Sequence, residues 1–234
     1  MERITTVIII FCLIAVSFAV TFLFWRYVWF FRNPSRIIAP GDNIVSPADG
    51  TIVYVKRLVS EDDVIVIKQG LSAKISDIMK EDVCMPKVLI GIFMSPLDVH
   101  YNRSPIEGRV DFVRHYPAKT KNLNMGSMQF RTLFKIRPYY CNSRHIVENE
   151  RSVTRIIGLF KGCPISSYVV QIAGGHVSGI DTYVPEGGGV SKGEIFGMIR
   201  IGSQVDLILP DLPNMKIKVS EGDIVKAGES VLVE

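Results

Sequence analysis

A long apolar run near the start of the chain limits its fold more than any other feature. Residues Thr5 to Phe24 carry no charged side chain, and thirteen of them are Val, Ile, Leu or Phe. As a helix the run would rise about 1.5 Å per residue and reach roughly 30 Å, the hydrocarbon thickness of a bilayer. At about −0.3 to −0.6 kcal/mol for each of these apolar residues, insertion is favoured by roughly 4–8 kcal/mol. The sequence therefore predicts a membrane segment followed by a separate folded part.

The residues after this run indicate an anchor that stays on the protein. No small-residue cleavage site follows, as a signal peptide would require. Aromatic residues interleaved with arginines follow instead, as at a membrane interface: Trp25, Arg26, Tyr27, Trp29, Phe30, Phe31 and Arg32. Because Arg26, Arg32 and Arg36 outnumber Arg3 on the other side, we expect the bulk of the chain on the cytoplasmic side of the cell membrane. Residues 1–36 are the predicted anchor and interfacial segment, which either spans the bilayer or lies in one leaflet.

The rest of the chain, residues 37–234, has the pattern of one β-rich domain. Short apolar runs, many rich in β-branched residues, are separated by turn residues, which is typical of strands. Strands are expected in GTIVYVKRLV, DVIVIK, KVLIGIFM, GRVDFVRHY, SYVVQIAG, FGMIRIG, QVDLILP and ESVLVE. Helical periodicity is scarce, with one short helix expected from Ser72 to Met79. We therefore expect a mainly β fold, a compact sandwich or irregular barrel with some short helices.

Charge and cysteine content argue against several classes of partner and cofactor. The net charge is +4 and the basic residues form no dense run, so a nucleic-acid partner is not expected. Some affinity for anionic lipid head groups is reasonable. The four cysteines, Cys12, Cys84, Cys141 and Cys163, show no metal-binding spacing, and Cys12 lies in the apolar run. Neither a metal site nor a disulfide framework is predicted.

Three short motifs in the β-rich part carry residues that could do chemistry. SPADG precedes a strand and holds Asp49, although Pro, Asp and Gly also make ordinary turns. FMSPLDVHYNRSPIEG holds His100 and Arg103, although a lone histidine is more often structural. IGSQVDLILP places the pair Gly202-Ser203 in a strand-like run, where glycine commonly marks a bulge. Each motif alone is weak evidence for an active site.

Together the motifs resemble the phosphatidylserine decarboxylase family, in its short, membrane-anchored bacterial and archaeal branch. FFRNP, SPADG, FMSPLDVHYNRSP, NERS and IGSQVDLILP occur in the family's order over residues 30–210. Members of the family are proenzymes that cut themselves at a Gly-Ser bond. The resemblance implies that the Ser203 hydroxyl attacks the Gly202 carbonyl, leaving a large chain, 1–202, and a small chain, 203–234. It also implies that residue 203 becomes a pyruvoyl group with release of ammonia, so no external cofactor or metal is expected.

The same resemblance implies roles in the reaction for three further residues. Asp49 and His100 are the candidates for the base that takes the Ser203 proton, with Asp49 acting directly or by orienting His100. In turnover the pyruvoyl ketone would form a Schiff base with the amino group of phosphatidylserine and accept electrons as carbon dioxide leaves. His100 would then donate the proton that gives phosphatidylethanolamine. Arg103 stands where larger members carry a second histidine, and its planar guanidinium suits a lipid phosphate or a carboxylate.

Alternative functions stay open beside this one. The substrate could be another serine lipid, such as archaetidylserine, because lipid tails leave little trace in these motifs. Ser178 and Gly179 replace two arginines of relatives, which could change the accepted head group. The ending VSEGDIVKAGESVLVE is similar to biotinyl and lipoyl carrier domains and allows a non-enzymatic membrane adaptor, although Lys216 stands too close to it for a carrier lysine. The partners expected of the enzyme are the phospholipid, the membrane and the two chains of one precursor, and a homo-oligomer is left open.

Overall fold

The chain forms two compact units, Met1–Pro34 and Ser35–Glu234. The computed structural model describes residues 2–60, 64–68, 71–80, 84–175, 179–200 and 202–234. The first unit holds the apolar run, and the second holds all the described strands.

The first unit is a helix that continues into a wider helical turn. Helix α1 (Glu2–Phe24) is followed by the π-helical turn η1 (Trp25–Trp29). The helical stretch Arg3–Trp29 is long and apolar enough to cross a membrane. Just after it, the Arg32 guanidinium lies 4.5 Å from the centre of the Trp29 ring. Such cation–π contacts fit the aromatic and basic interface expected from the sequence.

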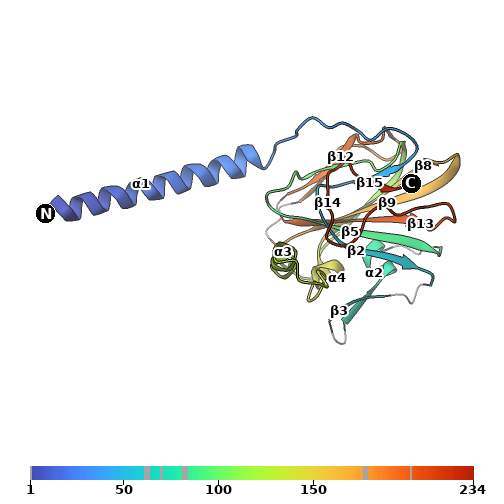
Figure 1. Ribbon diagram of the computed structural model, residues 1–234, viewed down its shortest axis with the longest axis horizontal. Coiled ribbons are helices and arrows are strands. Elements are labelled where there is room, and N and C mark those ends of the chain that lie inside the picture. The colour runs from blue at the N-terminus through green and yellow to red at the C-terminus, as the bar shows by residue number, and fades with distance from the viewer. Residues whose placement is uncertain (1, 61–63, 69–70, 81–83, 176–178, 201) are drawn as a thin grey trace. The chain divides into compact units, whose positions relative to one another are not determined.

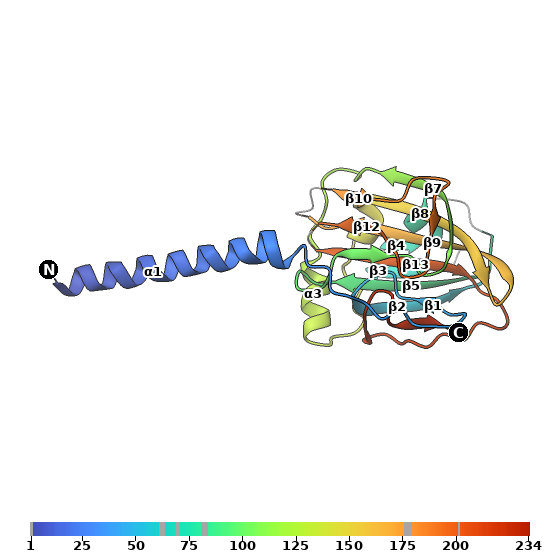
Figure 2. The same cartoon turned by 90° about the horizontal axis from the view of Figure 1, so that it is seen from above.

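The second unit is built on an eight-stranded antiparallel sheet with the order β11-β7-β8-β9-β13-β5-β2-β14. Figure 2 shows β13 between β9 and β5 in its middle. A three-stranded sheet (β10-β12-β6) and the pairs β1-β15 and β3-β4 complete the described strands. The strands are β1 (Ile44–Val45), β2 (Gly50–Leu58), β3 (Val64–Lys68), β4 (Leu71–Lys74), β5 (Lys87–Met94), β6 (Tyr101–Arg103), β7 (Gly108–Tyr116), β8 (Arg151–Phe160), β9 (Cys163–Ala173), β10 (Ile180–Thr182), β11 (Gly189–Val190), β12 (Ile195–Ile199), β13 (Ser203–Pro210), β14 (Ile224–Val225) and β15 (Val231–Val233). The helices are α2 (Ile75–Met79), α3 (Gly126–Leu133) and α4 (His145–Glu148).

Two apolar cores, one on each face of the large sheet, hold the second unit together. Strand residues alternate between them, as a pleated strand requires: Leu207 of β13 enters the first core and Ile208 the second. Phe196 of β12 closes the first core, and Ile78 of α2 closes the second. Figure 1 shows the short helices gathered on one side of the sheet. Because burying one large apolar side chain contributes about 1.5–3 kcal/mol, both faces stabilise the fold.

The run around the Gly-Ser pair consists of two strands in two different sheets. Strand β12 ends at Ile199 in the three-stranded sheet, and β13 begins at Ser203 in the centre of the large sheet. Gly202 has φ = +58°, a left-handed conformation that glycine adopts without the steric cost of a Cβ atom. Gly202 therefore lies where the chain crosses between sheets, and Ser203 is the first residue of the central strand.

The prediction of a mainly β fold with short helices behind an apolar N-terminal helix is confirmed. Each run expected to form a strand contains one. The helix expected from Ser72 to Met79 is limited to Ile75–Met79, because the residues before it pair with β3 as β4. The run RSVTRIIGLF forms β8 although Arg151 and Arg155 interrupt its apolar pattern.

Candidate active site

Strand pairing brings the three sequence motifs to one end of the large sheet. Thr51 of β2 pairs with Phe93 of β5, which pairs in turn with Gln204 of β13. In the next row, Met94 pairs with Ser203. SPADG, which ends just before Thr51, therefore lies near FMSPLDVH and the Gly-Ser pair, although the three are far apart along the chain.

Ser203 is fully buried in a polar environment between the two sheets. Its Oγ lies 3.4 Å from Met94 Sδ, a weak acceptor. Asn102 of β6 approaches the same sulfur at 3.7 Å, and Gln171 of β9 donates to Asn102 Oδ1 at 2.8 Å. Asn102 of the three-stranded sheet and Gln171 of the large sheet thus form a buried amide pair, which Met94 links to the hydroxyl.

His100 is fully buried two residues before Asn102, just ahead of β6. Its Nδ1 lies 3.0 Å from the Asp98 carbonyl oxygen. Because a carbonyl oxygen only accepts hydrogen bonds, Nδ1 of the neutral ring carries the proton and Nε2 is its basic nitrogen. The Asp98 carboxylate accepts from the Ser95 N–H at 2.7 Å, so this side chain closes the preceding turn. The Ile199 N–H donates to the His100 carbonyl at 3.3 Å and fixes His100 beside the end of β12.

Asp49 lies in a buried ion-pair cluster. Its Oδ2 accepts from the Arg36 guanidinium at 2.7 Å, and its Oδ1 accepts from the Ala227 N–H at 2.8 Å. Arg103 lies close to the same charges, and its guanidinium donates to the Gly193 carbonyl at 2.8 Å. Burial lowers the pKa of Arg103, and the nearby Arg36 lowers it further. The cluster ties SPADG to the start of the second unit and to the C-terminal segment.

A pocket of about 220 Å³ opens beside Gly202. Gly202 is half-buried, whereas Ser203 lies fully behind it. The wall is formed by the turn before His100, the start of α3 and the glycines after β9. Its lining residues are Phe93, Pro96, Asn124, Met125, Gly126, Gln129, Gly174, Gly175 and Gly202. Four glycines in the wall leave open space near the backbone of residue 202.

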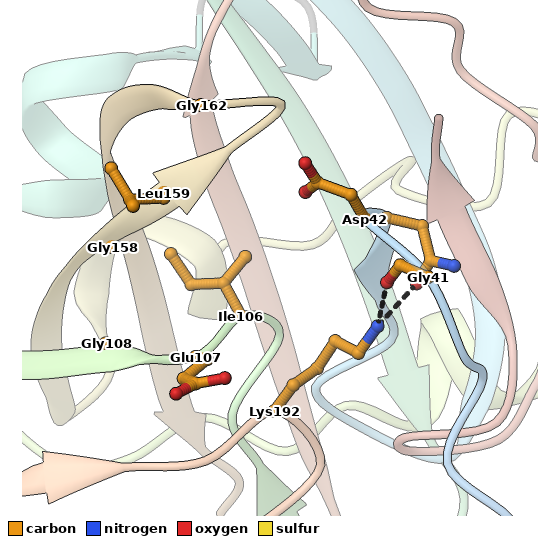
Figure 3. A pocket seen from close by; sticks show the side chains of 10 residues that line it. Gly41, Asp42, Ile106, Glu107, Gly108, Gly158, Leu159, Gly162 and Lys192 are labelled. Carbon is orange, nitrogen blue, oxygen red and sulfur yellow. Dashed lines mark hydrogen bonds between the residues drawn. The ribbon is translucent and has the colours of Figure 1, made fainter.

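A larger cavity, of about 590 Å³, has a different lining. Figure 3 shows Lys192 and Asp42 at its wall, with the Lys192 ammonium donating to the Gly41 carbonyl at 2.6 Å. None of the site residues predicted from the sequence lines this cavity. Gly202 is the predicted site residue that lines the smaller pocket, whereas Ser203, His100, Asp49 and Arg103 are not among its lining residues. Because of Gly202, the smaller pocket is the candidate active site.

A second buried polar network lies behind Ser203 on the opposite face of β13. Gln204 donates to Tyr54 Oη at 2.6 Å and to Asp206 Oδ1 at 2.7 Å, and Tyr54 donates to the same Asp206 oxygen at 2.8 Å. His145 Nε2 lies 3.0 Å from Gln204 Oε1 and donates to it. Burial raises the pKa of Asp206 to about 6 and lowers that of His145 to about 4. The Gln204 side chain, next to Ser203, is thus held through both ends of its amide.

Sequence reasoning missed the amide residues on both sides of Ser203. Gln204 is a polar residue at the start of the apolar run QVDLILP, and this is a usable signal because a buried amide needs hydrogen-bond partners. Asn102 lies in the polar segment DVHYNRSP, which gives no such signal. Among the described residues, no group of three or more His, Cys, Asp or Glu side chains could hold a metal ion. His176 and Ser178 lie outside the described residues.

Comparisons with known proteins give one consistent family. The family described as phosphatidylserine decarboxylase matches residues 23–233. A proenzyme from Methanocaldococcus jannaschii, whose name assigns it to archaetidylserine decarboxylation, is 34% identical, with 92% of this chain and 93% of the relative aligned. The phosphatidylserine decarboxylase proenzyme of Pelobacter propionicus is 36% identical, with coverages of 92% and 78%. That of Nitrobacter winogradskyi is 32% identical, with coverages of 88% and 68%.

Proposed function

This chain belongs to the phosphatidylserine decarboxylase family and is a carboxy-lyase of serine lipids, and we propose that it converts phosphatidylserine to phosphatidylethanolamine after cutting itself between Gly202 and Ser203. The observation that carries the proposal is the position of this bond. Ser203 begins the central strand inside a polar site, and a left-handed glycine beside the pocket precedes it. The family match also covers the C-terminal segment that resembles a carrier domain, which favours the enzyme over an adaptor.

The self-cleavage step uses groups of the chain and is followed by reaction with one water molecule. Ser203 Oγ forms a bond to the Gly202 carbonyl carbon as the C–N bond breaks, and His100 Nε2 takes the hydroxyl proton and passes it to the nitrogen of residue 203, which becomes an amine. Loss of the Cα proton of residue 203 to a base then expels the new ester as the Gly202 carboxylate and leaves dehydroalanine at position 203. Water converts this residue to a pyruvoyl group, and its nitrogen leaves as ammonia. The fixed tautomer of His100 supports its assignment as the base.

The surroundings of residue 203 fit a pyruvoyl group. Ser203 is paired with Met94 on one side and Ala173 on the other, so strand pairing can hold residue 203 after the bond before it is cut. A pyruvoyl group there would accept the electron pair left when the substrate's carboxylate departs as carbon dioxide. His100 is the proposed donor of the final proton.

Asp49 and Arg103 are proposed to position other groups of the site without contacting the reacting atoms. Both carboxylate oxygens of Asp49 are engaged, by Arg36 and by Ala227, which supports a positioning role for it. The substrate-binding role expected of Arg103 stays a prediction. Its bond to the Gly193 carbonyl supports a second role, in holding the glycine-rich loop before β12.

The apolar helix supports an assignment to the cell membrane. Arg3–Trp29 is the proposed anchor, and the arginines that follow it support a catalytic unit on the cytoplasmic side. The pocket beside Gly202 has the size of a head group, so it does not distinguish lipids with ester-linked tails from lipids with ether-linked tails. Archaetidylserine is therefore the second candidate substrate, favoured by the relatives named for it.

Intact mass spectrometry of the denatured protein tests the proposal. The wild-type protein should give a chain that ends at Gly202 and a small chain that begins with a ketone-bearing residue 203. Ser203→Ala should give one uncut chain without decarboxylase activity. Ser167→Ala, which changes another buried serine hydroxyl, is the matched control and should be cut normally. An uncut Ser203→Ala protein that still decarboxylates phosphatidylserine in vesicles would overturn the mechanism.

A further inference from the structure

Helix α3 presents large apolar side chains to solvent rather than to a core. Phe130, Leu133 and Phe134 are 56%, 73% and 60% exposed, and Met128 is the buried residue of this helix. The rings of Phe130 and Phe134 lie 4.6 Å apart, so these side chains form one patch. Ile136 extends the patch into the following turn. A contiguous exposed apolar patch of this kind marks an interaction surface.

The patch begins at the mouth of the candidate active site. Gly126 and Gln129 of α3 line the pocket together with Gly202. Phe130 and Leu133 lie one and two helical turns beyond Gly126 on the same face, because residues three or four apart are neighbours on a helix. The apolar stripe therefore runs outward from the pocket, and Figures 1 and 2 both show α3 at the periphery of the second unit.

A second element adds apolar surface at the same mouth. Pro96 lines the pocket, and the next residue, Leu97, is 67% exposed. Leu97 belongs to the turn that leads to His100. Exposed apolar side chains therefore lie on two elements that form the pocket, α3 and this turn.

The segment around α3 is basic throughout. Between Asp111 and Glu148 the chain has no acidic residue. Its basic residues are Arg114, Lys119, Lys121, Arg131, Lys135, Arg137 and Arg144. Apolar side chains beside cations are complementary to an anionic bilayer, where the former enter the acyl region and the latter stay among the phosphates. A symmetric contact with a second copy would instead bring like charges together.

We infer that α3 and the turn after it, residues 126–136, form a membrane-contact surface that inserts into the interface of an anionic phospholipid bilayer beside the active-site pocket. The inference rests on the proposed function, because a pocket for a lipid head group must meet the bilayer. A tether alone keeps an enzyme near the membrane without turning its pocket towards the lipid. The surface on α3 supplies that orientation, so that the head group reaches the pocket while the tails stay among lipids.

Quenching of a single tryptophan by brominated lipid tests the contact directly. The test variant is Leu133→Trp, and the matched control is Leu159→Trp at another exposed leucine. Each is made in the full-length chain with Trp25→Phe and Trp29→Phe, so that one tryptophan remains. The proteins are reconstituted into phosphatidylcholine and phosphatidylglycerol vesicles with or without bromine on the acyl chains. Tryptophan at position 133 should lose most of its fluorescence to the brominated lipid, and tryptophan at position 159 should lose little.

The other results of this measurement overturn the inference. Equal quenching at the two positions would mean that α3 has no special contact with the bilayer. A blue-shifted emission from the Leu133→Trp protein without quenching would mean that a second copy or another protein covers the patch. Because no turnover is measured, the result does not depend on the decarboxylase activity.

A kinetic comparison links the surface to the reaction. Leu133→Ser/Phe134→Ser removes exposed side chains that do not line the pocket, and Val59→Ser/Leu159→Ser is the control with similar exposure. The first variant should raise the KM for phosphatidylserine in vesicles about tenfold, as expected from lost burial of two apolar side chains, and should leave turnover of a water-soluble short-chain phosphatidylserine unchanged. An unchanged vesicle KM would refute the inference. A wild-type chain inactive on both substrates would refute the proposed function instead.

Discussion

The proposed proton transfer at residue 203 depends on the tautomer of His100. The Asp98 carbonyl accepts from Nδ1 of the neutral ring, so Nε2 is the nitrogen that we propose exchanges protons at the site. We expect His100→Gln to slow self-cleavage and turnover by about 10²-fold or more each, the usual contribution of general acid–base catalysis. Intact mass against time measures cleavage, and carbon dioxide released per mole of ketone-bearing small chain measures turnover.

His115 provides the matched control for this substitution. It is exposed and lies 3.3 Å from Glu150, away from the buried site, so His115→Gln should leave both rates unchanged. Full turnover by a cleaved His100→Gln protein would rule out His100 as the proton donor.

Gln204, next to Ser203, is held by Asp206 and His145, which change the stability of the fold with pH in opposite directions. The pKa of Asp206 is raised from 3.8 to about 6, so the folded state binds its proton first and Asp206 adds stability as the pH falls from 6 to 4. The pKa of His145 is lowered from 6.5 to about 4, so His145 removes stability over the same window. Each shift corresponds to roughly 3 kcal/mol. The two contributions oppose one another in the wild-type protein.

Removing one member of the pair should expose the pH dependence of the other. Asp206→Asn keeps an oxygen that can accept from Tyr54 and Gln204, so it should unfold progressively more easily than wild type as the pH falls from 6.5 to 4.5. His145→Gln keeps a donor for Gln204 and should show the opposite trend. Thermal midpoints of full-length protein in detergent, measured across this range, test both. Parallel curves for all three proteins would contradict the assignment.

At the scale of elements, one glycine lets β2 approach β5 beside the active site. Gly50 has φ = +149°, and a Cβ atom there would overlap the Phe93 carbonyl. We expect Gly50→Ala to lower the free energy of unfolding by about 1–3 kcal/mol or more through overpacking. It should also slow self-cleavage, because Phe93 precedes Met94, the partner of Ser203. Chemical denaturation and intact mass against time measure the two effects.

Substitution of a glycine that has open space around it serves as the control, because it introduces backbone strain without a clash with Phe93. Gly162 also has positive φ, +75°, but a Cβ atom there would meet nothing within 4 Å. Gly162→Ala should therefore cost only the left-handed penalty, about 1 kcal/mol, and leave cleavage at the wild-type rate. Equal losses in both variants would show that the Phe93 contact is unimportant.

Most strands were predictable from the sequence because they alternate or form continuous apolar runs. Strand β8 was harder, because Arg151 lies in it and is buried, with its guanidinium bonded to backbone carbonyls of α2 and α4. Helix α3 was also missed, because only Met128 of it enters the core and no apolar periodicity towards a core exists. The hydrophobic pattern of a segment predicts a helix or strand that buries an apolar face. It does not predict an element such as β8 or α3, where contacts with distant parts of the chain determine the structure.

For the candidate site, residue type and motif order are enough to predict Ser203, His100 and Asp49, whose roles stay predictions. Its surrounding amides depend on strand register across the chain. Asn102 meets Gln171 because β6 of the three-stranded sheet lies against β9 of the large sheet, and Gln204 meets Tyr54 across β5, which lies between β13 and β2. The tertiary arrangement of the strands determines these contacts, and a single sequence does not predict which side chains an amide will contact.

At the scale of the whole molecule, the proposed self-cleavage would cut the chain just before a buried central strand, β13. The segment 203–234 contributes β13 to the centre of the large sheet, β14 to its edge beside β2, and β15 to the pair with β1. Side chains of this segment enter both cores. Residues 203–234 therefore complete the fold, so a cut before Ser203 would not by itself release this segment.

We expect the cleaved small chain to remain bound unless the whole unit unfolds. Eight residues of β13 are paired with β5, and six of them also with β9, so release would leave many buried backbone groups without partners. Size-exclusion chromatography of cleaved protein in detergent should give one peak that contains both chains, and the same column in guanidinium should separate them. Ser203→Ala, which keeps the bond, should elute at the native position and unfold at a similar temperature. Loss of the small chain in native buffer would show that the covalent link, rather than strand pairing and core burial, holds β13 in place.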